Sequence, residues 1–226
     1  MKYWKLFSVF FFVNLTLDII FNNVDGLYNF RLITKPIVTI SLLLFYLLNS
    51  KHKTQKERIS IVFSLISLLL GDLFLMVNLP FYNFWAGSGF FLLANVFYAS
   101  AFYRSAHFDI DRSIPFIAIV SLVCLTLLYF IYDKLDSFFF PATLYMLITL
   151  NMSQAAFLRN RVVNNKSYYA IFLGSIFFLA SQASVAIIKF YGNFPYEKII
   201  VMLLYGLSQY LIIYGILVEK KKFRRF

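Results

Sequence analysis

Eight long apolar stretches constrain the fold more than any other feature of this sequence. A helix needs about 20 consecutive apolar residues to cross the roughly 30 Å hydrocarbon core of a bilayer. Only short polar segments separate the stretches, which cover residues 3–21, 33–49, 59–78, 84–103, 113–132, 137–157, 168–189 and 196–218. The sequence therefore predicts an all-α membrane protein, an eight-transmembrane-helix bundle that forms a single domain over residues 1–226.

The composition excludes an ordinary soluble globule. Hydrophobic residues make up 61% of the chain and charged residues 14%, whereas soluble domains are about half apolar and about 25% charged. The mean hydropathy is +0.76. Because so many apolar side chains cannot all be buried inside one domain of this size, we expect an integral membrane protein.

The basic residues predict the orientation. If the N-terminus is cytoplasmic, 16 of the 21 Lys and Arg residues fall in cytoplasmic loops and tails, and five fall on the outer side. Cytoplasmic loops carry such an excess of positive charge, so both termini are expected in the cytoplasm. The short loops suit a multi-pass protein of a bacterial inner (plasma) membrane. The same bias explains the net charge of +11 without a nucleic-acid partner, and the tail "EKKKFRRF" is read as a stop-transfer anchor that can also contact anionic headgroups.

Two carboxylates lie inside the expected spans, Asp18 and Asp72. Ionisable residues within spans are costly and are functional candidates by default. At about 1.5 Å per residue, both lie at nearly the same depth, together with Gln182, and Asn95 lies near the midplane. A polar pocket in the outer half of the bundle is therefore expected. Lys35, at the outer start of the second span beside Pro36, either pairs with Asp72 or extends to the interface. Alternatives with no function, a hydrogen-bonding role or helix pairing, stay open for all of these residues.

No cofactor or metal site is expected. The chain has one cysteine, Cys124, which cannot form an internal disulfide, and its two histidines, His52 and His107, fall in polar stretches between spans. No G-x-S-x-G or H-E-x-x-H sequence and no glycine-rich phosphate loop is present. Any chemistry therefore has to come from the carboxylates and their polar neighbours.

Five segments in succession resemble the YhhN family of membrane proteins, which includes the lysoplasmalogenases. They are "TKPIVTISLLL", "SLLLGDLFLM", "FWAGSGFFLLANVFYASAFY", "GSIFFLASQASVAIIKF" and "VMLLYGLSQYLIIYGIL", and the resemblance covers nearly the whole chain. The matching residues are Lys35, Pro36, Gly71, Asp72, Tyr98, Ser181, Tyr205 and Gln209. Asn95 stands where the family usually has His, and Gln182 stands where it often has Asp.

The resemblance implies hydrolysis of the vinyl ether bond of a lysoplasmalogen to a fatty aldehyde and a glycerophospho-headgroup. This reaction needs proton delivery to the alkene carbon and water addition to an oxocarbenium-like centre. A buried carboxyl group suits the role, since burial disfavours its charged form. Asp72 is the expected acid and base, Asp18 is a second catalytic candidate, and Lys35 is a phosphate contact or tunes Asp72. The expected substrate-binding residues are Lys35, Asn95, Tyr98, Gln182, Tyr205 and Gln209.

Two alternatives remain at this point. The two amides, Asn95 and Gln182, replace titratable groups, so the protein is either a hydrolase or a catalytically lapsed relative that binds lysolipid. A small transporter that uses Asp72 and Asp18 as proton or cation sites is a third hypothesis, although the sequence lacks the repeats typical of transporters. The expected partners are a lysophospholipid and the bilayer itself. Neither the headgroup nor the oligomeric state follows from the sequence.

Overall fold

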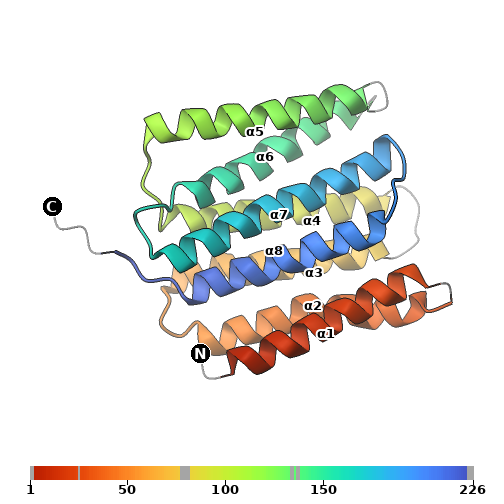
Figure 1. Ribbon diagram of the computed structural model, residues 1–226, viewed down its shortest axis with the longest axis horizontal. Helices are drawn as coiled ribbons and strands as arrows, with labels where there is room; N and C mark the ends of the chain where they lie inside the picture. The colour runs from red at the N-terminus through yellow and green to blue at the C-terminus, as the bar shows by residue number, and fades with distance from the viewer. Residues whose placement is uncertain (1–2, 25, 77–81, 133–134, 136–137, 223–226) are drawn as a thin grey trace. The chain divides into compact units, whose positions relative to one another are not determined.

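Eight helices make up most of the protein in a computed structural model, which describes residues 3–24, 26–76, 82–132, 135 and 138–222 (Figure 1). The helices are α1 (Trp4–Asn23), α2 (Tyr28–Asn49), α3 (Gln55–Met76), α4 (Tyr82–Tyr103), α5 (Ile110–Ile131), α6 (Phe139–Phe157), α7 (Asn165–Phe190) and α8 (Glu197–Leu217). Each corresponds to one expected span, so the all-α fold is confirmed. The expected span ends at residues 77–78 and 137 lie outside the described residues.

Seven of these helices are long and apolar enough to cross a membrane. The exception is α6, whose second half contains Asn151, Ser153 and Gln154. The protein is therefore a multi-pass integral membrane protein by the length and composition of its helices. An eighth crossing by α6, the cytoplasmic position of both termini and the bacterial inner membrane stay predictions.

The expected start of the second span at residue 33 is wrong. Helix α2 begins at Tyr28, so Pro36 lies well inside the helix and not at its start. The polar run before residue 33 suggested a loop, but α2 already includes Arg31, whose side chain lies 3.7 Å from the Asp18 carboxylate. A proline inside a membrane helix leaves a backbone carbonyl without its usual donor, and neighbouring side chains can satisfy such groups. The carbonyl that loses its donor to Pro36 is that of Leu32, and close to it the Asn14 amide of α1 donates to the Thr34 carbonyl at 3.0 Å, which adds a polar contact between α1 and α2 beside the proline.

Helix α3 also begins earlier than expected. The segment "NSKHKTQKER" was predicted to be a loop, but its last residues form the first turn of α3. The hydroxyl of Thr54 accepts a hydrogen bond from the Glu57 amide at 3.3 Å, which is a capping interaction at a helix N-terminus. Lys53 pairs with Glu57 at 2.9 Å and neutralises its buried carboxylate. The polar residues therefore begin the helix.

The chain divides into two compact units, Met1–Tyr98 and Ala99–Phe226. In the first unit α1 packs on α2 and α2 packs on α3. Glycines bring α3 and α4 together: a Cβ atom added at Gly71 would lie 2.8 Å from the Phe91 ring, and one at Gly87 would lie 2.7 Å from Leu75. Small residues allow such close approach between membrane helices. The expectation of one domain over residues 1–226 stays a prediction.

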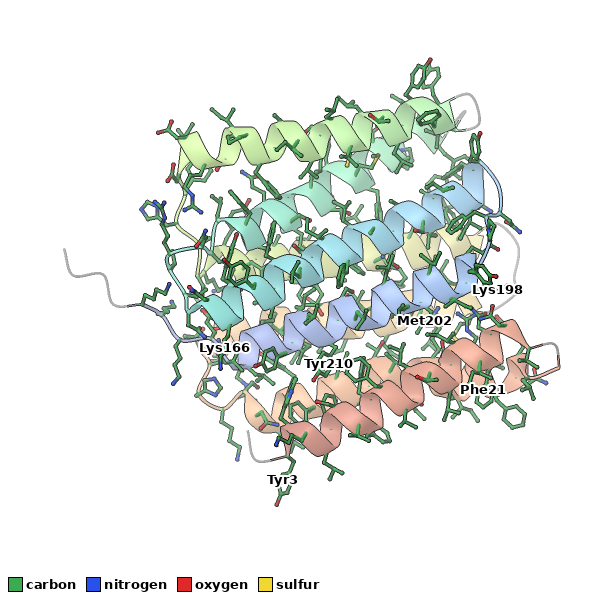
Figure 2. The ribbon with its side chains drawn as sticks, in the orientation of Figure 1. Tyr3, Phe21, Lys166, Lys198, Met202 and Tyr210 are labelled. Carbon is green, nitrogen blue, oxygen red and sulfur yellow. The ribbon has the colours of Figure 1, made fainter. Side chains whose placement is uncertain are left out.

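In the second unit the closest pairing is between α7 and α8. Their backbones approach at Gly174, where an added Cβ would lie 2.9 Å from the Ser208 carbonyl oxygen, and at Gly215, where it would lie 3.0 Å from the Ser167 carbonyl oxygen. The two helices are antiparallel, as Figure 2 shows: Lys166 and Lys198, each the second residue of its helix, lie at opposite ends of the pair. This agrees with the assignment of these lysines to opposite sides of the membrane.

Candidate functional site

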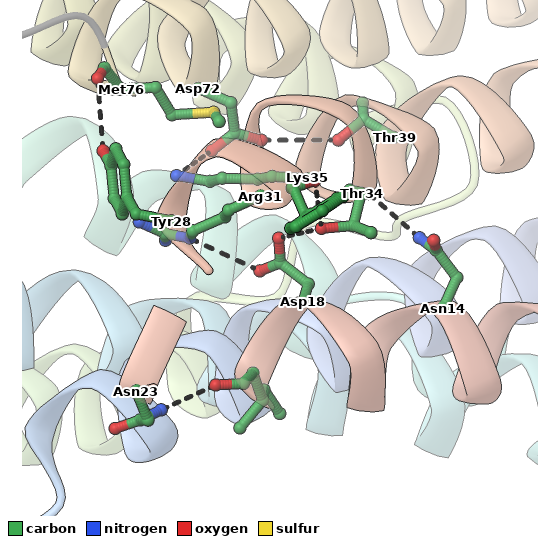
Figure 3. A network of polar contacts seen from close by, with 12 residues as sticks. Asn14, Asp18, Asn23, Tyr28, Arg31, Thr34, Lys35, Thr39, Asp72 and Met76 are labelled. Carbon is green, nitrogen blue, oxygen red and sulfur yellow. Dashed lines mark hydrogen bonds and ion pairs between the residues drawn. The ribbon is translucent and has the colours of Figure 1, made fainter. Parts of the chain in front are cut away.

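Two cations on one face of α2 organise a polar cluster in the first unit (Figure 3). Arg31 and Lys35 are four residues apart and so lie one above the other on the helix. The Nζ atom of Lys35 lies 3.1 Å from Oδ1 of Asp72 on α3. Both residues are buried, with exposed fractions of 8% for Lys35 and 1% for Asp72. The prediction that Lys35 pairs with Asp72 is thus confirmed, and the alternative that Lys35 extends to the interface is not.

The second carboxylate, Asp18 of α1, faces the same helix. It is fully buried. Its Oδ1 atom accepts a hydrogen bond from the Thr34 hydroxyl at 2.9 Å, and its Oδ2 atom lies 3.7 Å from Nε of Arg31. At that distance Asp18 and Arg31 form an ion pair but not a hydrogen bond. Asp18 and Asp72 therefore reach one cluster from α1 and α3, at the common depth that the sequence predicts.

Further hydrogen bonds connect the cluster to its helices. The Thr39 hydroxyl donates to Oδ2 of Asp72 at 3.4 Å, so this carboxylate has a contact from α2 at each oxygen. The Tyr28 hydroxyl donates to the Met76 carbonyl at 3.2 Å and links the first residue of α2 to the last residue of α3. These contacts position the carboxylates by packed helices rather than by loops.

The cluster explains why a leucine-rich helix contains a carboxylate. A lone charge in a membrane span is expensive, and such residues are retained where they pair within the bundle. Two carboxylates and two cationic side chains lie together here, so their charges sum to zero when all four groups are ionised. All four lie within about two helical turns of the helix ends remote from the N-terminus, which is the outer end if the positive-inside orientation holds.

Two other predicted site residues lie on α4 in the same unit. Asn95 and Tyr98 are fully buried, and the residues at helical spacing from them, Gly87, Phe91 and Phe102, are buried as well. Phe91 lies against Gly71, the neighbour of Asp72. Asn95 follows Phe91 by one turn, about 6 Å along the helix and away from the Asp72 level. The role of Asn95 and Tyr98 in substrate binding stays a prediction.

The remaining three predicted residues belong to the second unit. Tyr205 and Gln209 are buried on α8, where the Gln209 amide donates to the Ser208 hydroxyl at 3.3 Å. Gln182 on α7 is only half-buried. Its neighbour Ser181 donates to the Val201 carbonyl of α8 at 3.0 Å and so helps to join the two helices. That these residues share a pocket with Asp72 stays a prediction.

Arg31 and Thr34 were not predicted as site residues. Arg31 was expected in the outer loop before α2, and Thr34 lies inside the expected span but was not singled out. A signal was available: Arg31 and Lys35 have helical spacing, and two cations at that spacing beside two buried acids suggest paired charges. The pairing partners themselves require the three-dimensional arrangement.

A second buried ion pair lies in the second unit, and the sequence did not predict it. Arg159 is almost fully buried at the end of α6. Its Nη2 atom lies 3.4 Å from Oε2 of Glu219 and donates to the Ser167 hydroxyl at 3.1 Å. The Ser105 hydroxyl donates to the other Glu219 oxygen. Because Glu219 follows α8, these contacts attach the C-terminal segment to the loops beside α5 and α7.

The fold and the cluster define a class: a multi-pass, all-α membrane protein with two buried carboxylates that are each paired to a cation from one helix. The YhhN family model matches residues 30–216, which is most of the chain and runs from the first turn of α2 to the last turn of α8. This chain belongs to the YhhN family. No curated protein and no solved structure matches it.

Proposed function

We propose that this protein is an ether-lipid hydrolase of the lysoplasmalogenase type, with acid and base chemistry at Asp72. The observation that carries the proposal is the buried Lys35–Asp72 pair at 3.1 Å, within a chain of the YhhN family. Vinyl ether hydrolysis requires a positioned proton donor, and a buried carboxyl group that packed helices hold in place supports that role for Asp72. The substrate is a lysoplasmalogen, and the products are a fatty aldehyde and a glycerophospho-headgroup.

The reaction uses one proton and one water molecule and needs no oxidant. Asp72 first takes up a proton and then delivers it to the alkene carbon that is not bonded to oxygen, and this leaves a positive oxocarbenium centre at the carbon bonded to oxygen. Water adds to that centre and returns a proton to the Asp72 carboxylate. The hemiacetal then collapses to the aldehyde and the glycerol alcohol. The Lys35 ammonium stabilises the carboxylate that proton donation leaves behind, because opposite charges at this distance attract strongly in a buried site.

The second candidate function is lysolipid binding without turnover. The observation that favours it is the fully buried Asn95, an amide at the position where the family usually has His. Loss of a general acid or base typically costs about 10²–10⁴-fold in rate. In this case the same cluster binds the lipid, and the vinyl ether remains intact.

Fatty-aldehyde release from lysoplasmenyl-ethanolamine by the purified protein in detergent tests the two functions. We expect turnover by the wild type and its loss in Asp72→Asn, which keeps the shape and removes the proton transfer. Exposed Lys198→Gln serves as the control for purification and folding. If a folded wild type shows no turnover with either the ethanolamine or the choline headgroup, the hydrolase function is refuted and lysolipid binding without turnover is favoured.

A further inference from the structure

Arg31 is bound less completely than the other three charges of the cluster. Its Nε atom lies 3.7 Å from Asp18, beyond hydrogen-bond distance. Its side chain remains 14% exposed, whereas that of Asp18 is fully buried. Among the residues that the structure describes, none provides a hydrogen bond to either Nη atom of Arg31. The outer edge of the guanidinium group, with its two parallel N–H donors, is therefore open to a ligand.

Lys35 is in the opposite situation. Its ammonium group lies 3.1 Å from Asp72, and the Lys35 side chain is 10% exposed. The charge of an ammonium group that a buried carboxylate holds at this distance is already largely neutralised, so a second anion gains less from binding it. The expectation that Lys35 is the phosphate contact is therefore less favourable than a role in holding Asp72. Arg31 is the cation that can bind an anion and keep its place.

The surroundings of Arg31 hold the guanidinium group in position. The Tyr28 ring lies 5.8 Å from the Arg31 guanidinium carbon, within the range of a cation–π contact. Tyr28 is itself fixed by the hydrogen bond of its hydroxyl group to the Met76 carbonyl. Arg31 also lies in the first turns of α2, where the helix dipole favours negative charge, and the N-cap residue Leu27 provides no side-chain cap. Figure 3 shows Tyr28, Arg31 and Asp18 together at this end of the cluster.

We propose that Arg31 is the phosphate-binding residue of this cluster and that its two Nη atoms bind two oxygens of one phosphate group. Guanidinium groups match phosphate oxyanions with two parallel hydrogen bonds, a geometry that an ammonium group does not offer. The ligand class is a phosphate ester, in the first instance the headgroup phosphate of a lysophospholipid. The inference rests on the proposed lipid site, but it needs no turnover, because binding precedes chemistry in the hydrolase and is the whole function of the lapsed relative.

The arrangement makes a prediction that a structural ion pair does not. Asp18 and the phosphate compete for one guanidinium group. Replacing Asp18 with Asn removes the competing charge and should therefore tighten phosphate-ester binding. If Arg31 only neutralised Asp18, the same replacement would leave ligand binding unchanged or weaken it.

Equilibrium binding to the full chain in a neutral detergent tests the proposal. The probes are an alkyl-ether lysophosphatidylethanolamine, which has no vinyl ether bond to cleave, an alkylglycerol with the same chain and no phosphate, and inorganic phosphate. We expect Arg31→Gln to weaken the lysophospholipid about 10- to 100-fold, the range for loss of hydrogen bonds to a charged group. Binding of the alkylglycerol should not change. The affinity of Arg31→Lys for the lysophospholipid should fall between those of the wild type and Arg31→Gln. Asp18→Asn should bind the lysophospholipid more tightly than the wild type does.

Two controls keep the outcome decisive. Arg104→Gln makes the same substitution at an exposed arginine and should bind all three probes as the wild type does. The double variant Asp18→Asn with Arg31→Gln leaves no unpaired carboxylate, so it should fold normally and still lack tight phosphate-ester binding. Thermal unfolding of each variant checks the fold independently.

The probes also distinguish the source of the phosphate. If inorganic phosphate binds with the same dependence on Arg31 and the lysophospholipid gains nothing from its chain, the ligand is a free phosphate. Equal affinities of the wild type and Arg31→Gln for the lysophospholipid would overturn the proposal, and so would an equal loss for the phosphate-free lipid. Since none of the probes can be hydrolysed, these results stand whether or not the wild type releases aldehyde from a vinyl ether.

Discussion

The strongest energetic prediction concerns the Lys35–Asp72 pair. Two unit charges 3.1 Å apart attract each other by about 5 kcal/mol at an effective dielectric constant of about 20. Removing one partner of a buried pair leaves the other charge unpaired and typically costs about 3–5 kcal/mol. We therefore expect Lys35→Met to lower the free energy of unfolding by about 3–5 kcal/mol. Asp72→Asn should cost somewhat less, because its amide oxygen still accepts a hydrogen bond from the ammonium group.

The double variant with both changes measures the interaction energy of the pair separately from the effects of the two single substitutions. It buries no unpaired charge at either position, so its loss of stability should be smaller than the sum of the two single losses by more than about 2 kcal/mol. Hydrogen bonds between membrane helices give coupling energies of about 0.6 kcal/mol on average and about 1.7 kcal/mol at most. A coupling above that range therefore identifies an ion pair rather than a hydrogen bond.

Reversible unfolding of the purified variants in mixed micelles, at increasing fractions of a denaturing detergent, measures these energies. Lys198→Met is the matched control, because Lys198 is exposed and the change should stay within about 0.5 kcal/mol. Additive losses in the double variant would show that Lys35 and Asp72 do not interact in the folded protein. That result would refute the reasoning behind both the charge balance and the proposed stabilisation of the Asp72 carboxylate.

Three further predictions concern stability away from the cluster. Gly174→Ala should lower the free energy of unfolding by about 1–3 kcal/mol, because the new methyl group meets a backbone carbonyl of α8, whereas Gly89→Ala, with no atom within 4 Å, should raise it by up to about 1 kcal/mol. Equal effects of the two changes in thermal unfolding would contradict the close packing of α7 and α8. Thr54→Ala removes the cap of α3 and should cost about 1 kcal/mol in the same assay, and no change would mean that the cap is not formed. Glu219→Ala leaves the buried Arg159 without its carboxylate and should expose the C-terminal segment to carboxypeptidase digestion, and digestion at the wild-type rate would argue against that attachment.

The helices could be predicted from the sequence because the membrane leaves few alternatives. Lipid forces every backbone group in a span to bond within the chain, so a long apolar run is helical almost regardless of its details. The ends are less constrained, since polar residues there are compatible with either a loop or a first helical turn. Two helix starts were therefore predicted too late. Helix α3 begins at the Thr54 cap, and α2 already includes Arg31, which pairs with Asp18 in a segment that looked like a loop.

The candidate site could be predicted only in part. Depth along a helix follows from residue counting, and this placed Asp18 and Asp72 at one level. Which cation meets which acid depends on how α1, α2 and α3 rotate about their axes, and the sequence pattern does not fix that rotation. Pairing of Lys35 with Asp72 was one of two alternatives that the sequence left open, whereas the pairing of Arg31 with Asp18 was missed. The ion pair of the buried Arg159 was also missed, because its partner Glu219 lies far away in the sequence.

The charge balance of the cluster also separates the candidate functions. Asp18 and Asp72 carry two negative charges when ionised, and Arg31 and Lys35 carry two positive charges, so the four sum to zero. A transported cation would add a positive charge to a buried neutral site or would have to displace Lys35 or Arg31, and either event is costly in a low-dielectric environment. A vinyl ether is uncharged, so it can enter the cluster beside Asp72 without disturbing this balance. The phosphate that accompanies it brings its negative charge to the partly exposed edge of Arg31, where water and the start of α2 can stabilise the added charge. The balance of charges therefore favours a lipid with an uncharged ether beside Asp72 and a phosphate beside Arg31, as proposed above, over a cation as the ligand of this cluster.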